Sequence, residues 1–193
     1  MSEVDRAEAM AARLTDTFLH SGVPEGDAHS VVRAYWLAME RRRDLDVEHP
    51  MALHPARTVL ILFHDCRVRD AAVLSAAAAI DTHASTRAVP CSTLASEVGA
   101  GAAQVCADVP VPQVAGEELL EALLIAEHNA QLIALAERLD FARHLHLLPD
   151  ENWGREHALV RAVYLPVALR ADEMLGRRFA RWVDAFGRRR LKE

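Results

Sequence analysis

The fold is decided by the stretch Asp70-Ala71-Ala72-Val73-Leu74-Ser75-Ala76-Ala77-Ala78-Ala79. Aspartate is a favoured helix N-cap, because its carboxylate accepts hydrogen bonds from the free N–H groups of the first turn, so Asp70 predicts a helix over residues 71–79. Most of the side chains that follow are alanine, the best helix former, and they let neighbouring helices approach closely. We therefore expect this helix to lie at the centre of the domain.

Helical periodicity extends from this stretch toward both ends of the chain. No segment shows the alternation of a strand, and the connections are short, which favours one all-α domain, a bundle of about eight to ten helices. The other expected helices cover residues 2–22 with Ser2 as N-cap, 28–39, 54–63, 92–105, 117–143 as one helix or two, a segment capped by Asp150 that Pro166 kinks or restarts, and 175–187.

Composition narrows the class of protein. A chain of 193 residues can bury a real core. The sequence contains no run of about eighteen apolar residues, so we expect no membrane span. The first residues, 1–6, are acidic and lack the apolar core of a signal peptide, so we expect a cytoplasmic location. The three cysteines are odd in number and lack zinc-site spacing, which indicates reduced thiols.

Charge is unevenly distributed. The formal net charge of −6 argues against general nucleic-acid binding. The C-terminal residues 177–192 are the exception, because they are rich in arginine. These cations suit the negative end of a helix dipole, or they form a surface for a partner or a phosphate.

Three residues in separate segments suggest a metal site: His54 at a helix start, Asp81 after the alanine-rich helix and Glu137 in an apolar run. A hydrolytic divalent cation needs imidazole and carboxylate ligands, with open positions for water and phosphate. Each residue alone has an ordinary explanation: a turn histidine, a helix-end charge and an exposed pair with Arg138.

Their order and neighbours resemble the HD-type hydrolase domain of the RelA/SpoT family, most closely its small stand-alone members, which remove pyrophosphate from guanosine tetraphosphate (ppGpp). The resemblance spans about residues 31–186. It rests on Arg42-Arg43, Pro50 and His54-Pro55, on the stretch 59–79, on Glu97-Val98-Gly99 with Val105, on Leu135-Ala136-Glu137-Arg138-Leu139 with Arg143 and Leu145, and on Pro149-Asp150 with Trp153.

This resemblance implies an HD-domain-like helical domain over residues 23–193, preceded by an added N-terminal helix in 1–22. It also implies a manganese-type divalent metal held by His54, Asp81 and Glu137. Arg43 corresponds to the arginine that packs on the guanine base in that family. A guanidinium plane suits such stacking better than a lysine would.

The departures from the family bear on activity. Its metal-binding His-Asp pair falls on Ile80-Asp81, and its two catalytic acids fall on Ala84 and Ser85. Losing a supporting residue around a metal already lowers affinity about ten- to hundredfold, so losing a ligand should weaken binding further. General acid–base groups contribute roughly 10²- to 10⁴-fold. We therefore expect hydrolysis to be lost or very weak.

Three hypotheses remain open. In the first, the chain is a degenerate HD-domain pseudoenzyme that binds ppGpp or another nucleotide. In the second, it is an active metal-dependent phosphohydrolase with a variant site, in which His83 replaces the lost ligand from the same helix face. In the third, it is a non-catalytic protein-interaction module. In the last case the aromatic residues of the C-terminal helix, Phe179, Trp182 and Phe186, form a homodimer face or close the core.

Overall fold

Every regular element in the described residues is a helix, as periodicity predicted. This computed structural model describes residues 3–45, 49, 51–82, 85–111 and 116–191. The α-helices are α1 (Glu3–His20), α2 (Glu25–Glu40), α3 (His54–His64), α4 (Ala71–Ala79), α5 (Cys91–Glu97), α6 (Ala100–Ala107), α7 (Gly116–Ile125), α8 (His128–His144), α9 (Trp153–Leu159), α10 (Leu165–Ala171) and α11 (Glu173–Arg190). A π-helical segment, Val160–Tyr164, joins α9 to α10 without a break. Counted with that join as one helix, the described residues form ten helices, which confirms the all-α bundle.

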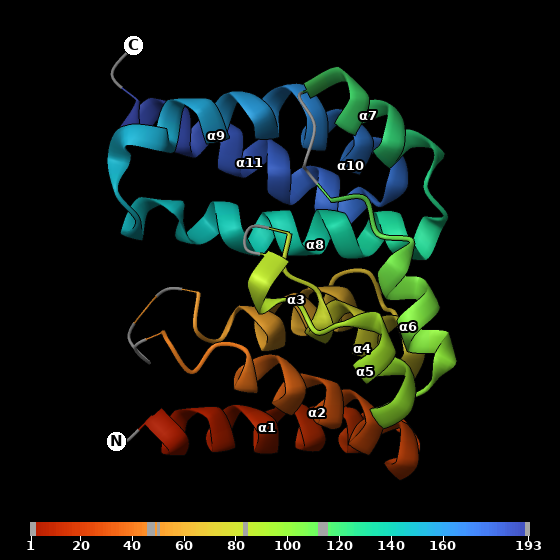
Figure 1. Ribbon diagram of the computed structural model, residues 1–193. Helices are drawn as coiled ribbons and strands as arrows, with labels where there is room; N and C mark the ends of the chain where they lie inside the picture. The colour runs from red at the N-terminus through yellow and green to blue at the C-terminus, as the bar shows by residue number, and fades with distance from the viewer. Residues whose placement is uncertain (1–2, 46–48, 50, 83–84, 112–115, 192–193) are drawn as a thin grey trace.

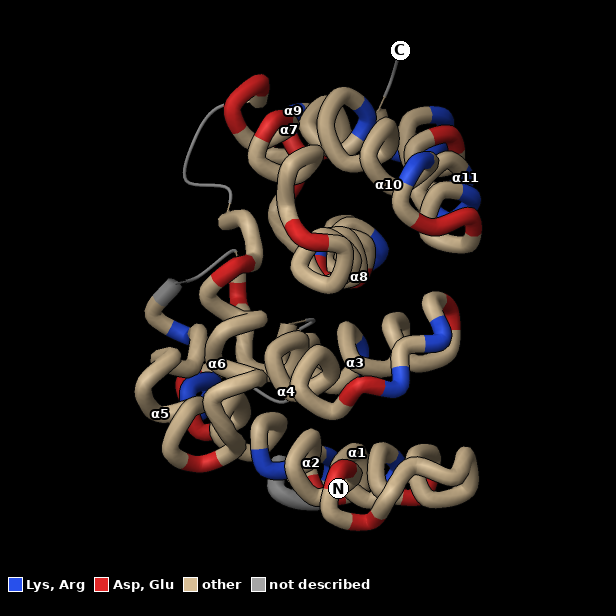
Figure 2. The backbone as a smooth tube through the Cα atoms, turned by 90° about the vertical axis from the view of Figure 1, so that its right-hand side faces the viewer, with Lys and Arg blue, Asp and Glu red and all other residues tan. Residues whose placement is uncertain are grey.

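Helix α8 runs through the middle of the molecule (Figure 1). Helices α1 to α6 lie on one side of it, and α7 and α9 to α11 lie on the other (Figure 2). Helices α3 and α4 pack on α8 from the first side, and α10 and α11 pack on it from the second. Residues of α8 can therefore reach both groups of helices.

The alanine-rich helix α4 lies in the core as predicted. The Asp70 carboxylate accepts hydrogen bonds from the backbone N–H groups of Ala72 at 2.8 Å and Val73 at 3.2 Å. Every residue from 73 to 79 is buried. Helices α2 and α6 pack against it, and the small side chains allow this close approach.

Helix α1 belongs to the same core. Leu14 and Phe18 are fully buried, and the Phe18 ring meets Phe63 of α3 edge-on, with 4.9 Å between ring centroids. The helix ends as predicted near Gly22, which has a positive φ of 78°. The predicted N-cap, Ser2, lies outside the described residues.

Two sequence-based predictions of helix boundaries are wrong. The helix expected over residues 92–105 is two helices, because Gly99 adopts a φ of 137° that glycine tolerates and other residues rarely do. Asp150 does not cap a helix but opens a short 3-10 turn, Asp150–Asn152. The segment 117–143 divides into α7 and α8, one of the two alternatives given.

The aromatic residues of α11 close the core. Phe179 is fully buried and stacks on Tyr164, and Phe186 is buried beside Trp182 at 4.9 Å between ring centroids. Gly176, also on α11, lies against α10, where an added Cβ would meet the Leu169 Cα at 3.0 Å. Of the helices described, none has the length and apolarity needed to cross a membrane.

Candidate functional site

The three predicted site residues come from separate elements and meet in the interior. His54 is the first residue of α3, Glu137 lies in α8 and Asp81 follows the end of α4. All three are buried. His54 Nε2 lies 3.3 Å from Glu137 Oε1. Thr82, next to Asp81, ties its segment to Glu137, donating from its backbone N–H at 3.1 Å and its hydroxyl at 2.5 Å.

Asp81 forms a buried ion pair with Arg42. The Arg42 Nη2 donates to Asp81 Oδ2 at 2.8 Å, and the two side chains are 1% and 9% exposed. Burial lowers the pKa of Arg42, and the charges of Asp81 and Glu137 oppose that shift. Arginine is so strongly basic that it stays charged, so the carboxylate of Asp81 is neutralised from within the protein.

His54 is held between two carboxylates. Its Nδ1 lies 2.6 Å from Asp140 Oδ2, and Arg57 donates to Asp140 Oδ1 from Nε at 2.8 Å and to Oδ2 from Nη2 at 2.9 Å. Burial alone would lower the pKa of His54, but hydrogen bonds and charges from Asp140 and Glu137 raise it to about 9. At neutral pH the ring is therefore an imidazolium, with an N–H donor on each nitrogen.

The pKa of Asp140 shifts in the opposite direction to that of His54. Burial would raise its pKa, but the hydrogen bonds and charges of His54 and Arg57 outweigh burial and lower it. His144 also lies 3.5 Å from Asp140, and burial lowers the pKa of this histidine, which favours its neutral form. Asp140 is thus an ionised carboxylate clamped between an imidazolium and a guanidinium.

Together these residues form what we call the buried ion network. Among the residues that the structure describes, its three carboxylates and three cations balance, and Thr82 supplies further hydrogen bonds to one carboxylate. The members are Arg42, His54, Arg57, Asp81, Glu137 and Asp140. Buried charges are tolerated only when they are paired and hydrogen-bonded. Each charge of this network is paired, although the Arg42 Nε has no hydrogen-bond partner among the described residues.

The network does not fit a divalent cation as it is arranged. In the part of the chain that the structure describes, no group of three or more His, Cys, Asp and Glu side chains is placed to hold a metal ion. Asp81 is held by Arg42, and both nitrogens of His54 face carboxylates. Adding a divalent ion would upset a charge balance that the side chains already achieve.

The remaining predicted positions lie around this network. Ile80 is buried among apolar side chains, as expected for a residue that cannot bind metal. His83 and Ala84 lie outside the described residues. Ser85 begins a short 3-10 turn, Ser85–Arg87, whose last residue forms an ion pair with Asp44 at 2.9 Å.

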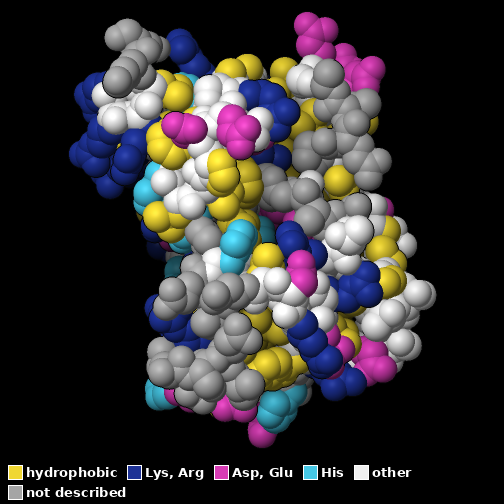
Figure 3. All heavy atoms as spheres, turned by 60° about the vertical axis from the view of Figure 1, so that its left-hand side comes forward, with side chains coloured by type: hydrophobic (Ala, Val, Ile, Leu, Met, Phe, Trp, Pro, Cys, Tyr) yellow, Lys and Arg dark blue, Asp and Glu magenta, His cyan; other side chains and the backbone are white. Residues whose placement is uncertain are grey.

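Arg43, the predicted nucleotide contact, is exposed near the end of α2. It lies 3.8 Å from Glu40, and its side chain is 78% exposed. A shallow pocket of 390 Å³ beside it is lined by Glu40, Arg41, Arg43, Asp44, Thr86 and Arg87. On the face that Figure 3 turns forward, basic and acidic side chains intermingle in the lower half, and dark-blue side chains gather at the upper left.

Sequence reasoning missed half of the network. Arg42 enters only through the Arg42-Arg43 pair that carries the resemblance, and Arg57 and Asp140 have no predicted role. One signal was present: Asp140 lies three residues after Glu137, so the two carboxylates share a helix face that an apolar pattern would not contain. No comparable signal marks Arg42, because its partner lies 39 residues away.

Comparisons with known proteins add no relative. The chain matches no protein-family model, no curated protein and no solved structure.

Proposed function

We propose that this chain is a degenerate HD-domain protein of the RelA/SpoT hydrolase type, a pseudoenzyme that retains a nucleotide site without efficient hydrolysis. The observation that carries the proposal is the buried ion network. It lies where the resemblance puts the metal ligands, and Arg42 and protonated His54 supply the positive charge that a metal would otherwise bring.

The residues expected to activate water support the same conclusion. The resemblance puts the family's two catalytic acids on Ala84 and Ser85. An alanine has no proton to exchange, and a serine hydroxyl is no base near neutral pH without a basic partner. Hydrolysis would lose both the metal and the general base, and general acid–base groups alone contribute roughly 10²- to 10⁴-fold.

The retained ligand of this proposal is a guanine nucleotide such as guanosine tetraphosphate. Arg43 would stack on the base, and Arg41 and Arg87, which line the same pocket, would face the phosphates. Arg87 is paired with Asp44, and Arg41 donates to the Thr86 carbonyl at 2.8 Å, so both side chains are already oriented. Guanidinium groups match phosphate oxygens in geometry as well as in charge.

Calorimetry with guanosine tetraphosphate tests this proposal, performed with and without manganese and paired with an assay for released pyrophosphate. We expect binding that manganese does not strengthen, and no turnover. Arg43→Gln should weaken binding at least about tenfold, as loss of a charged contact does. Arg170→Gln, an exposed arginine on α10, is the matched control. Manganese-dependent turnover, or equal binding by both variants, would contradict the proposal.

One observation favours the alternative, a metal-dependent phosphohydrolase with a variant site. A carboxylate that holds one nitrogen of a histidine is typical of metal sites, and Asp140 holds His54 Nδ1 in this way while His54 Nε2 faces Glu137, another expected ligand. This alternative requires Asp81 to leave Arg42. Metal analysis of protein purified without chelator, followed by manganese titration, separates the two: one bound equivalent that is lost in Glu137→Gln supports the alternative.

A further inference from the structure

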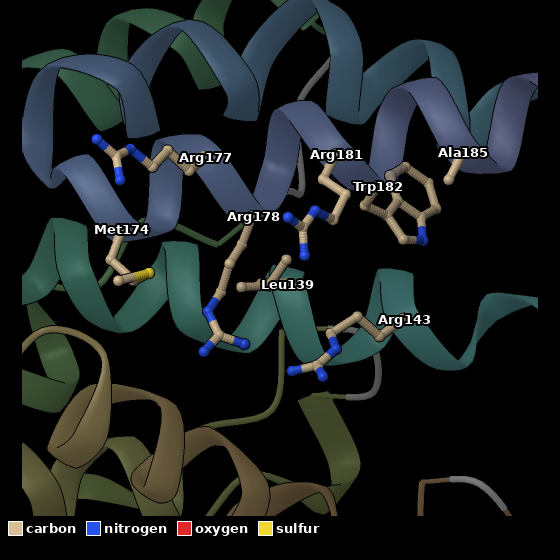
Figure 4. Close-up of a pocket in the computed structure, with 8 residues that line it drawn as sticks. All are labelled: Leu139, Arg143, Met174, Arg177, Arg178, Arg181, Trp182 and Ala185. Carbon is tan, nitrogen blue, oxygen red and sulfur yellow. The ribbon is translucent and has the colours of Figure 1, made fainter.

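A basic groove lies between α8 and α11, far along the chain from Arg43. It has a volume of 510 Å³ and is lined by four arginines and four less polar residues: Arg143, Arg177, Arg178, Arg181, Leu139, Met174, Trp182 and Ala185. Figure 4 shows Arg178 and Arg181 extending from α11 toward α8, where Arg143 extends alongside them, while Arg177 points away.

A second groove adjoins the first, because Arg143 and Arg178 line both. It continues over α3 to α1 and adds Arg13 and Arg57, together with three histidines. We call the two together the arginine groove. Its whole lining contains six arginines and two acids, Asp65 and Asp140. The chain as a whole carries a net charge of −6, whereas these six arginines, set against the two acids and Glu173, the ion-pair partner of Arg177, leave an excess of three positive charges.

Ion pairs account for only half of these arginines. Arg57 pairs with Asp140, Arg178 pairs with Asp65 at 2.6 Å, and Arg177 pairs with Glu173. Arg13, Arg143 and Arg181 form no ion pair with any residue that the structure describes. Arg143 is near enough to help lower the pKa of Asp65, which burial raises.

Uncompensated arginines that converge in a concave site attract anions with several acidic oxygens. Guanidinium groups bind phosphate through paired hydrogen bonds, and a groove focuses their field on a ligand. The volume suits a small molecule. The apolar wall formed by Leu139, Met174 and Trp182 reduces competing water, which strengthens charge interactions.

From these contacts we infer that the arginine groove is a binding site for a small oligophosphate, either free or as the phosphate end of a larger metabolite. The site is separate from the pocket beside Arg43, and the inference does not depend on the nucleotide proposal. Arg143 and Arg181 are the principal contacts. Arg178 stays paired with Asp65 and orients the approach of the ligand.

The test uses inorganic tripolyphosphate as the probe, in calorimetry with the full chain at low ionic strength. Arg143→Gln/Arg181→Gln should weaken binding at least about tenfold, since two charge-assisted contacts are lost. The control Arg161→Gln/Arg170→Gln removes the same charge from exposed positions outside the groove and should change binding less than about threefold. Adenosine triphosphate in a parallel titration shows whether an organic group adds affinity.

Two further readouts keep the inference separate from the nucleotide proposal. Arg41→Gln/Arg43→Gln should leave tripolyphosphate binding unchanged. The indole N–H resonance of Trp182, assigned with Trp182→Phe, should shift on titration because this side chain lines the groove. Circular dichroism verifies that each variant is folded. Absence of binding, equal weakening by all three double variants, or loss only in Arg41→Gln/Arg43→Gln would overturn the inference.

Discussion

The buried ion network and the arginine groove share Arg57 and Asp140 at their border, but they treat charge in opposite ways. In the network, three carboxylates meet three cations, and nearly all of the side-chain surface is buried. The lining of the groove has six arginines and two acids, and one of these acids, Asp140, already belongs to the network. An unpaired charge is costly in the interior but is solvated in an open groove. The network can therefore exist only in balance, whereas the groove can keep an excess of charge for a ligand.

Helix α8 contributes to both regions because successive residues turn by 100°. Glu137 and Asp140 face the network, whereas Leu139 and Arg143 line the groove, and Asp140 also borders the part of the groove over α3. Arg138 points in a third direction, where it pairs with Glu156 at 2.9 Å and lies over the Tyr164 ring. A helix that buries charges on several faces shows no simple apolar stripe.

The largest effect should follow from breaking the network's balance. Asp81→Ala leaves the Arg42 guanidinium buried without its carboxylate, and we expect the free energy of unfolding to fall by about 3–5 kcal/mol. Urea denaturation measures this change in the free energy of unfolding. Arg42→Met/Asp81→Leu removes both charges and should be clearly more stable than the single variant. If Asp81→Ala unfolds like the wild type, the pair is not buried as described.

A rise in pH should weaken the same region. The pKa of His54 is raised from 6.5 to about 9 in the folded state. Its stabilising contribution is therefore complete below pH 6.5 and is lost as pH approaches 9, a loss of about 3 kcal/mol over that range.

Urea denaturation at pH 6.5, 7.5 and 8.5 measures this loss of stability. All three pH values lie below the ordinary cysteine pKa of 9.0. His54→Gln should be less stable than the wild type at pH 6.5 but should lose little further stability by pH 8.5. Parallel pH profiles for the two proteins would show that His54 is not an imidazolium in the folded state.

A smaller effect tests how rigidly the groove side is built. Gly176→Ala forces a Cβ against the Leu169 backbone at 3.0 Å, and we expect a loss of about 1–3 kcal/mol as α10 and α11 move apart. Gly154→Ala is the matched control, because nothing lies within 4 Å of its added Cβ. That variant should be unchanged or about 0.5 kcal/mol more stable. Denaturation that gives the same free energy of unfolding for the two variants would mean that α11 has room to shift.

The smallest effect on stability should come from the groove arginines. Arg143→Gln/Arg181→Gln should change the free energy of unfolding by less than about 0.5 kcal/mol, because these exposed side chains form no ion pair with the described residues. A large loss in urea denaturation would show that the groove is structural rather than a site for a ligand. The contrast with Asp81→Ala thus separates charges that hold the fold from charges kept for binding.

Much of the fold was predictable because its signals are local. Asp70 as a cap, alanine as a helix former and the stop at Gly22 act within a few residues, and each prediction is confirmed. There were two exceptions. Asp150 opens a 3-10 turn and does not cap a helix. Around Gly99 the sequence suggested one helix where there are two, because its dihedral angle depends on how α5 and α6 both pack.

The candidate site was predictable only in part. The positions of His54, Asp81 and Glu137 were expected to lie close together, and the structure puts all three segments in one buried cluster. Their partners were not foreseen, since Arg42 and Asp81 are 39 residues apart, and His54 and Asp140 are 86 residues apart. Which cation pairs with which carboxylate depends on distances of a few ångströms that no local pattern encodes.

By itself, the sequence determined that the chain is helical, where most helices begin, and that Ile80, Ala84 and Ser85 cannot supply a metal ligand or a strong base. Only the tertiary structure decided that Arg42 and His54 neutralise the buried carboxylates and that scattered arginines form one groove. The physical reason is the distance along the chain between the residues that interact. Helix formation is governed by residues within one or two turns, whereas charge pairing depends on segments that meet only after the chain has folded.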